Sequence, residues 1–346
     1  MHADSPATEP TPVHDLDRAS TRRDWLVRAA VCSLLPVALP TLAQPAGAAF
    51  HPTRSVRIVS PQQAGGSTDA ILRPLAGKLA ELWGQAVNIE NKPGGGSIIA
   101  TQTVVQAPPD GHTLGLAINS LTINPSLRSD LPYDTLSQLT PVTLIGSVTV
   151  ALVVHASLGV DDLPGFVAYA KAKPGAVSWA SLGIGTGGHV TGELLARRAG
   201  IDMVHVPFSG SSGAYRELLP GRVQAAFVVL ESALPHLRNG TLRLLAVTDP
   251  RRNRQFPAVP TLAEHYPGLG YEGIFGIVAP AGLPPALLRA LHADIVKILG
   301  DPEVREQLER QSMDVIAAPP QEFAQVIRRE IEHWRVAVRE SGAKLN

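Results

Sequence analysis

The sequence predicts an α/β fold with two mostly parallel βα domains joined by two crossover strands. Short apolar runs alternate with helical patterns from residue 50 onward, as expected for strands that alternate with helices. This alternation occurs twice, first over residues 56–120 and again over residues 163–247. The apolar runs at 142–154 and 271–278 are each suited to a strand that passes from one half to the other.

Length and composition are consistent with this architecture. The chain has 346 residues, a length typical of two domains. Its 30 acidic and 30 basic residues balance, which argues against a nucleic-acid-binding protein because such proteins usually carry an excess of Lys and Arg. The charged fraction of 17% is low, and glycine and proline are frequent. Both features favour a compact, loop-rich protein.

Residues 1–48 are expected to be a disordered leader and an export signal peptide. Residues 1–20 are polar and proline-rich, a composition typical of disorder. Arg22 and Arg23, within the segment 21–26, precede a short apolar run, as in a secretory signal. Its paired arginines resemble a twin-arginine signal, and an ordinary secretory signal with two adjacent arginines remains the alternative. Cleavage could follow Ala43 or Ala48.

The same segment contains the chain's one cysteine, Cys32. The mature protein would therefore have no cysteine, and neither a disulfide framework nor thiol chemistry is expected. The apolar run is too short to span a bilayer. We therefore expect a soluble product outside the cytoplasmic membrane, in the periplasm.

The first alternation, over residues 56–120, predicts a βαβαβ unit. Apolar β-formers predict strands, amphipathic stretches predict helices, and Pro108-Pro109-Asp110-Gly111 predicts a turn. The expected strands are 56–60, 86–90 and 113–118, and the expected helices are 69–82 and 98–106. Such a unit implies a parallel sheet with ligands at the carboxyl ends of its strands.

The second half repeats this pattern. Its expected strands are 177–180, 203–206, 225–229 and 242–247, and its expected helices are 163–173, 190–199 and 214–219; helices at 285–300, 302–310 and 321–341 close the chain. With the two crossover strands, this predicts a first lobe made of residues 52–149 and 275–346. Residues 150–274 would form the second lobe.

The loop at residues 64–69 is the most informative candidate site. Gly65 and Gly66 allow the backbone to turn, and Ser67 or Thr68 can cap the helix that follows. The free N–H groups of the first helical turn and its positive dipole end favour an anion. The loop therefore predicts a site for a carboxylate without any cationic side chain. Asp69 either supports the helix start or points into the cleft, where it could bind a ligand amine.

Four loops of similar composition follow apolar strands, at residues 64–69, 119–124, 181–189 and 208–213. Taken singly, each could be an ordinary βα connection. Together they can converge on one ligand, with backbone N–H groups and hydroxyls as donors. The candidate ligand-binding residues are Ala64, Gly65, Gly66, Ser67, Thr68, Asp69, Asn119, Ser120, Ser181, Gly185, Thr186, Gly187, His189, Phe208, Ser209, Gly210 and Glu231.

Two patterns in the third loop resemble other kinds of binding site, and neither of them is complete. Gly183, Gly185 and Gly188 form a nominal dinucleotide fingerprint, which requires an acid at the end of the next strand. Asp202 stands at the start of that strand instead. His189 and Glu193 are spaced as a possible metal pair, but a third ligand is missing, so a helix-surface contact is expected.

Catalytic motifs are also missing from the sequence. No serine lies in the G-x-S-x-G context of an esterase, and the carboxylates show no paired acid–base pattern. An exported α/β protein with polar glycine loops and no catalytic set is expected to be a binding protein. We expect no enzymatic activity, no cofactor and no metal.

From about residue 52 to the C-terminus, the chain resembles the Bug (TctC-like) substrate-binding proteins of tripartite tricarboxylate transporters. The matching stretches include SVRIVSPQQAGGSTDAILRPLAGKL, VNIENKPGGGSIIATQTV, APPDGHTLGLA, NPSLRSDLPYDTLSQLTPVTLI, HVTGELLARRAGIDMVHVPFSGSSGA, LPHLRNGTLRLLAVTDPRR, VPTLAE and APAGLPPALLRALHADIVKIL. The resemblance implies a two-lobed periplasmic binding protein, or Venus flytrap, that closes on its ligand.

The resemblance also implies a function. The protein would be a monomer that captures a small carboxylate, such as a dicarboxylate, an aromatic acid or an amino acid, for membrane permease subunits. The loops at 64–69 and 181–189 would hold the carboxylate. A ligand-dependent sensor for a membrane kinase and an exported enzyme acting on a carboxylic acid remain as alternatives.

Two features depart from the family pattern. Many relatives carry Pro-Phe before the first loop, whereas this chain has Gln62 and Gln63 there. This polar pair could reshape one wall of the pocket. Glu231 would be unfavourable near an anionic ligand unless its carboxylate is turned away or meets an amine. Both features bear on the choice of solute.

Overall fold

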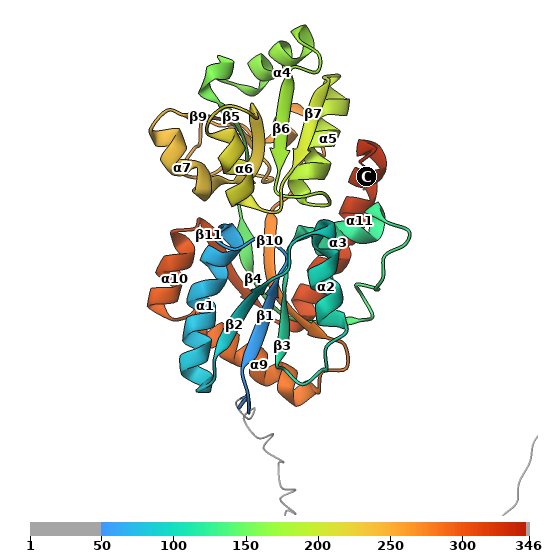
Figure 1. Ribbon diagram of the computed structural model, residues 1–346, viewed down its shortest axis with the longest axis vertical. Coiled ribbons are helices and arrows are strands. Elements are labelled where there is room, and N and C mark those ends of the chain that lie inside the picture. The colour runs from blue at the N-terminus through green and yellow to red at the C-terminus, as the bar shows by residue number, and fades with distance from the viewer. Residues whose placement is uncertain (1–49, 344–346) are drawn as a thin grey trace, which may run out of the picture. The chain divides into compact units, whose positions relative to one another are not determined.

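The computed structural model describes residues 50–343, which form two β-sheets flanked by helices (Figure 1). The strand orders are β11-β4-β10-β3-β1-β2 in one sheet and β7-β6-β8-β5-β9 in the other. We call the first sheet with its helices the first lobe and the other the second lobe. The leader and export signal expected over residues 1–48 lie outside the described residues. Among the helices that are described, none has the length and apolar character needed to cross a membrane.

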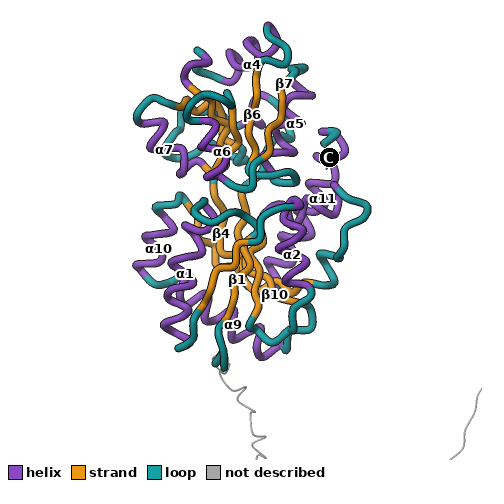
Figure 2. The backbone as a smooth tube through the Cα atoms, viewed as in Figure 1, coloured by secondary structure: helices purple, strands orange, loops and turns teal. Residues whose placement is uncertain are grey.

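The first lobe contains the N-terminal βαβαβ unit and the C-terminal helices. Its strands are β1 (Val56–Ser60), β2 (Val87–Asn91), β3 (Thr113–Ala117), β4 (Leu139–Val148), β10 (Gly273–Pro280) and β11 (Met313–Ala318). Its helices are α1 (Ser67–Trp83), α2 (Ile98–Val105), α3 (Asn119–Leu127), α9 (Pro285–Leu299), α10 (Pro302–Glu309) and α11 (Pro320–Ser341), with a short 3-10 turn at Gly95–Ser97. The tube in Figure 2 shows these helices outside the sheet.

The second lobe contains the middle of the chain. Its strands are β5 (Val150–His155), β6 (Val177–Ser181), β7 (Met203–Pro207), β8 (Ala225–Val229) and β9 (Leu242–Val247). Its helices are α4 (Leu163–Ala172), α5 (Gly187–Ala199), α6 (Ser211–Leu218), α7 (Leu230–Arg238) and α8 (Leu262–His265), with a 3-10 turn at Ala156–Leu158.

The α/β architecture with two sheets is as predicted, but the sheets are mixed rather than mostly parallel. Parallel pairing joins β1 to β2 and β3, and β6 to β7 and β8. The strands at the crossovers pair antiparallel: β10 with β3 and β4, β4 with β11, and β5 with β8 and β9. The apolar run at 142–154 is accordingly divided into β4 and β5, which belong to different sheets.

Each lobe has an apolar core, and α11 takes part in both. Ile58, Leu75 and Ile277 belong to the core beside the first sheet, and Phe166 and Trp179 to the core of the second lobe. On α11, Phe323 packs in a first-lobe cluster and Trp334 packs in the second-lobe core. The last helix therefore links the two lobes beside the crossover strands.

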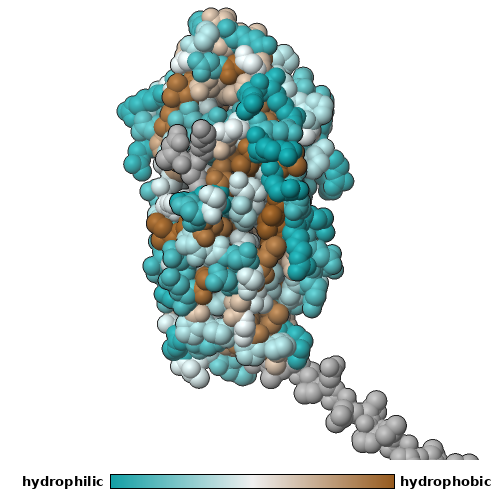
Figure 3. Space-filling model, turned by 90° about the vertical axis from the view of Figure 1, so that its right-hand side faces the viewer, coloured by the Kyte–Doolittle hydropathy of each residue, from teal (hydrophilic) through white to brown (hydrophobic). Residues whose placement is uncertain are grey.

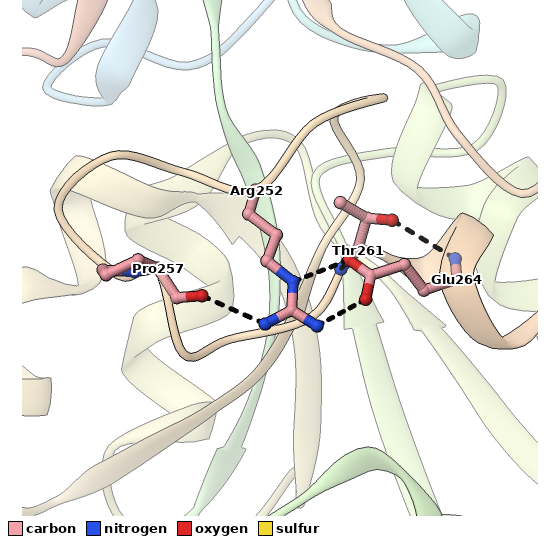
Figure 4. A network of polar contacts seen from close by, with 4 residues as sticks. All are labelled: Arg252, Pro257, Thr261 and Glu264. Carbon is pink, nitrogen blue, oxygen red and sulfur yellow. Dashed lines mark hydrogen bonds and ion pairs between the residues drawn. The ribbon is translucent and has the colours of Figure 1, made fainter.

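A polar network fixes the chain between β9 and β10, the segment that returns to the first lobe (Figure 4). Arg252 donates to both carboxylate oxygens of Glu264 at 2.8 and 2.5 Å, and to the carbonyl of Pro257 at 3.0 Å. Glu264 and Thr261 form a capping box at the start of α8. The hydrogen bond from Arg252 lowers the pKa of Glu264 to about 2, so this network is ionised at neutral pH.

The surface mixes hydrophilic residues with smaller apolar areas, as the face in Figure 3 shows. The exposed large apolar side chains of the described residues are Leu82, Ile99, Leu136, Val204, Ile316 and Val336. They come from several separate elements, and single exposed apolar side chains are normal on a protein surface.

Candidate ligand-binding site

A cavity of about 60 Å³ lies between the two lobes. This volume corresponds to a handful of water positions, since one water needs about 10–15 Å³ on this scale. The lining residues are Gln62, Ser67, Thr68, Ile118, Asn119, Ser120, Val148, Val150, Leu182, Thr186, Gly187, Gly188, Phe227, Val229, Tyr271, Gly273, Ile274 and Phe275. No side chain of this described set carries a formal charge.

The polar part of the cavity consists mainly of the first turns of three helices. Ser67 and Thr68 begin α1, Asn119 and Ser120 begin α3, and Gly187 and Gly188 begin α5. N–H groups in the first turn of a helix have no acceptor within the helix, and the dipole gives this end a partial positive charge. Helix starts from both lobes therefore make the cavity attractive to an anion.

The helix starts are capped differently from the prediction. The N-cap of α1 is Gly66, without a side-chain cap, so neither Ser67 nor Thr68 has the expected capping role. The Thr68 hydroxyl is buried and has no hydrogen-bond partner within the described chain. At α5, Thr186 accepts from the His189 N–H at 3.4 Å and donates to the Gly183 carbonyl at 2.7 Å. Thr68 thus lines the cavity with a hydroxyl that has no partner among the described residues.

The structure brings only some of the predicted site residues to the cavity. Those that line it are Ser67, Thr68, Asn119, Ser120, Thr186 and Gly187. Phe208 and Ser209 line a wider adjoining groove of about 720 Å³, which shares Gln62, Leu182 and Thr186 with the cavity. The remaining candidates line neither space: Ala64, Gly65, Gly66, Asp69, Ser181, Gly185, His189, Gly210 and Glu231.

Asp69 supports the first loop instead of facing the cavity. Its carboxylate accepts hydrogen bonds from the Gly65 N–H and Asn91 Nδ2, both at 2.9 Å, and from Arg73 at 2.8 Å. Burial alone would raise the pKa of Asp69, but these hydrogen bonds together lower it. The alternative in which Asp69 meets a ligand amine is not supported, because its oxygens are already bound within the first lobe.

Glu231 is also turned away from the cavity. It lies in the first turn of α7, and its carboxylate accepts a hydrogen bond from the Ser312 hydroxyl at 2.5 Å. Of the alternatives stated for Glu231, the structure therefore agrees with the one in which its carboxylate is turned away from the ligand.

Asn119 lines the cavity, but its side-chain amide is hydrogen-bonded to the start of β10 and to the residue before it. Its Nδ2 donates to the carbonyl of Glu272 at 3.0 Å, and its Oδ1 accepts from the Ile274 N–H at 3.1 Å. Nδ2 also approaches the Glu330 carboxylate on α11 at 3.3 Å. Asn119 therefore positions the start of α3 against β10 and α11.

The loops of the two lobes touch at the edge of the cavity. The Gln63 N–H donates to the carbonyl of Ser209 at 2.9 Å, and the Ser67 N–H donates to the Ser211 hydroxyl at 3.2 Å. A Cβ placed on Gly96 would lie 2.8 Å from the Ile184 carbonyl oxygen. These contacts describe a closed arrangement, in which glycine allows the backbones to approach.

His189 is buried, which contradicts the expected helix-surface contact with Glu193. Its ring stacks on His205 with centroids 4.6 Å apart, and His205 stacks on Trp179 at 4.3 Å. Ligand atoms of His189, Glu193 and His205 lie within 4.8 Å of one another. Stacked rings do not direct their in-plane nitrogens at one ion, and His189 Nδ1 already accepts the Gly185 N–H at 3.2 Å. His189 Nδ1 is therefore engaged within the loop at residues 181–189 rather than free for an ion.

These histidines predict an acid-sensitive fold. Burial lowers the pKa of His189 from 6.5 to about 4 and, with the nearby His189, that of His205 to about 3. The unfolded chain takes up these protons at a higher pH than the folded chain. The stability that the neutral histidines contribute is therefore fully present above pH 6.5. The free energy of unfolding falls as the pH drops toward 4, by about 3 kcal/mol from His189 alone. Urea unfolding at several pH values measures this loss.

The matched control is His189→Asn, which removes one of the two titrating rings. Its free energy of unfolding should fall less steeply between pH 6.5 and 4 than that of the unchanged protein. Equal slopes for the two proteins would show that His189 does not titrate in this way.

Several lining residues were not among the predicted candidates. Gln62 was considered only as a possible wall of the pocket; it is buried, and its Oε1 has no partner within the described chain. Phe227, Tyr271 and Phe275 supply aromatic surface from strands and their ends. The expected crossover at 271–278 was the available signal for the last two, because strands between lobes necessarily pass the cleft.

Comparison with known proteins identifies relatives over nearly the whole chain. A family profile described as "Tripartite tricarboxylate transporter family receptor" (TctC) matches residues 71–343. Protein BugT of Bordetella pertussis is 36% identical over 312 residues, which cover 89% of this chain and 96% of BugT.

Two solved structures resemble this chain in both fold and sequence. R. palustris Rpa4515 with adipate has a TM-score of 0.79 and 30% identity, covering 85% of this chain and 99% of that one. MatC from Rhodopseudomonas palustris with bound malate has a TM-score of 0.78 and 30% identity, covering 83% and 99%.

Proposed function

We propose that this chain, which belongs to the tripartite tricarboxylate transporter receptor family, captures a small carboxylate between its lobes as a solute-binding protein. The observation that carries this proposal is the cavity itself. Helix starts from both lobes meet there, the Thr68 hydroxyl is unpartnered, and no lining side chain among the described residues is charged. Such a site offers neutral, directional donors to an anion.

The relatives support the same class of ligand. One similar structure holds adipate and another holds malate, and both compounds are carboxylates. The carboxylate of this chain's solute would accept hydrogen bonds from Thr68 on one side and from the Gly187 and Gly188 amides on the other. Because these donors come from different lobes, binding favours the closed arrangement by its differential affinity.

The family also supports a proposal for where and with which partner the protein acts. Receptors of this kind deliver solute to a transporter, so the closed form is the state that membrane permease subunits would meet. The apolar run after Arg22 and Arg23 supports export to the periplasm by a signal peptide, with the twin-arginine route as the specific proposal. We further propose that the protein acts as a monomer.

Titration calorimetry with a panel of carboxylates tests the function. The panel contains aliphatic monocarboxylates, dicarboxylates, citrate, aromatic acids and amino acids, with the uncharged amide of each aliphatic acid as the matched control. At least one acid should bind, and its amide should bind much more weakly. A folded protein that binds none of these acids would contradict the proposal.

A further inference from the structure

We infer that the solute is a small monocarboxylate with an uncharged, apolar body, rather than a di- or tricarboxylate. This inference rests on the proposed function and specifies the solute class for the same cavity. Its basis is the separation of polar and apolar lining groups by structural element. One carboxylate can be satisfied at the helix starts, and the rest of the cavity offers no comparable site.

The apolar part of the cavity comes from the strands. Val148 ends β4, Val150 begins β5, Phe227 and Val229 lie in β8, and Ile274 and Phe275 lie in β10; all of them line the cavity. Each of these side chains is buried. They favour methylene, methyl or aromatic groups of a ligand.

Few hydrogen-bonding side-chain groups of the cavity are left without a partner in the described chain. The side-chain amide of Asn119 is already hydrogen-bonded to the backbone at Glu272 and Ile274. The Ser120 hydroxyl donates to the Ser97 hydroxyl at 2.6 Å. Thr186 is engaged as the cap of α5. Thr68 and the first-turn amides can satisfy one carboxylate. Gln62 adds an amide with an unpartnered oxygen, which suits a donor group of the ligand better than a second anion.

A second carboxylate has no cationic partner in the cavity. The adjoining groove contains Arg128, but its Nε and one Nη donate to different oxygens of Asp130, both at 2.7 Å. This bidentate pair already neutralises the guanidinium. A second carboxylate away from the helix starts would therefore lie among apolar side chains, where an unpaired charge is strongly unfavourable.

The test compares isocaproate with succinate by titration calorimetry on the folded mature protein at neutral pH. The two acids have the same number of non-hydrogen atoms, and an isopropyl group in isocaproate replaces the second carboxylate of succinate. Isocaproate should bind at least about 100-fold more tightly, because a buried charge without partners is penalised. Equal binding or a preference for succinate would overturn the inference and leave the proposed function in place. If neither acid nor any other carboxylate binds, the proposed function itself fails.

Variants of the apolar wall give an independent readout. Val150→Thr keeps the side-chain shape but replaces a methyl group by a hydroxyl, so the preference for isocaproate over succinate should fall by about threefold to tenfold. Val229→Thr is a second variant, in case the first one is poorly folded. The control is Val204→Thr, because Val204 is 48% exposed and lies outside the cavity. An unchanged preference in both wall variants would overturn the assignment of the apolar wall.

Discussion

Replacing Thr68 by valine is expected to weaken carboxylate binding by about 10- to 100-fold. Valine has nearly the same shape as threonine but cannot donate a hydrogen bond. The Thr68 side chain is 1% exposed, lines the cavity and has no partner within the described chain. A hydrogen bond to a charged group contributes about 1.5–3 kcal/mol, which corresponds to this change in affinity. Titration calorimetry measures it.

The control for this prediction is Thr135→Val in the same lobe. Thr135 is also buried, but its hydroxyl donates to the Leu121 carbonyl at 3.3 Å, and it does not line the cavity. Its replacement should lower the free energy of unfolding without a comparable change in affinity. If the two variants lose affinity equally, Thr68 has no specific contact with the ligand.

Replacing Gly96 by alanine is expected to lower affinity about tenfold more than replacing Gly95. Both residues have positive φ angles, +63° and +57°, so alanine is strained at either position. Only at Gly96 would the new Cβ approach the other lobe, at 2.8 Å from the Ile184 carbonyl oxygen. At Gly95 the Cβ would make ordinary contacts of 3.6 Å with Ile98 and Ile99. The difference in affinity between the two variants therefore measures how much the contact between the lobes at Gly96 contributes to binding.

The measurement combines calorimetry with thermal unfolding of both variants without ligand. The two unfolding temperatures should be similar, because the strain of positive φ is common to both positions. If Gly95→Ala and Gly96→Ala bind the ligand equally, contact between the lobes at this seam does not contribute to binding.

Local sequence patterns predicted most of the strands and helices because they depend on period and on turn residues. The expected strand at 56–60 and helix at 163–173 agree closely with β1 and α4. The region at 119–124 was expected to be a loop, yet α3 begins there. Asn and Ser often favour turns over helix interiors, and in α3 the Asn119 amide is paired with β10.

The mixed pairing of the sheets could not be read from local pattern. A crossover strand has the same apolar composition whether it enters a sheet parallel or antiparallel, so the direction of β10 depends on the path of the whole chain. The strand β11 was likewise absent from the prediction. It completes the edge of the sheet beside β4, more than 150 residues away in sequence.

The candidate site likewise has one part that local sequence patterns predict and another part that depends on contacts between distant segments. The starts of α1 and α5 were predictable because a glycine loop between a strand and a helix is a local signal. The apolar wall as a whole was not: the expected crossover at 271–278 was a signal for Phe275, but the meeting of Val150, Phe227 and Phe275 depends on how distant segments pack. The position of Glu231 depended on its contact with Ser312, and the environment of His189 depended on His205 of a neighbouring strand. Contacts between distant segments of this kind carry no local signature.

A crystal structure with the most tightly binding carboxylate would locate the ligand. We expect its carboxylate in the cavity, with oxygens within about 2.7–3.2 Å of the Thr68 hydroxyl and of an amide at Gly187 or Gly188. Its body should contact the apolar wall at Val150 and Phe275. A carboxylate bound instead at Arg128 in the outer groove, or by another cationic side chain, would contradict capture by the helix starts.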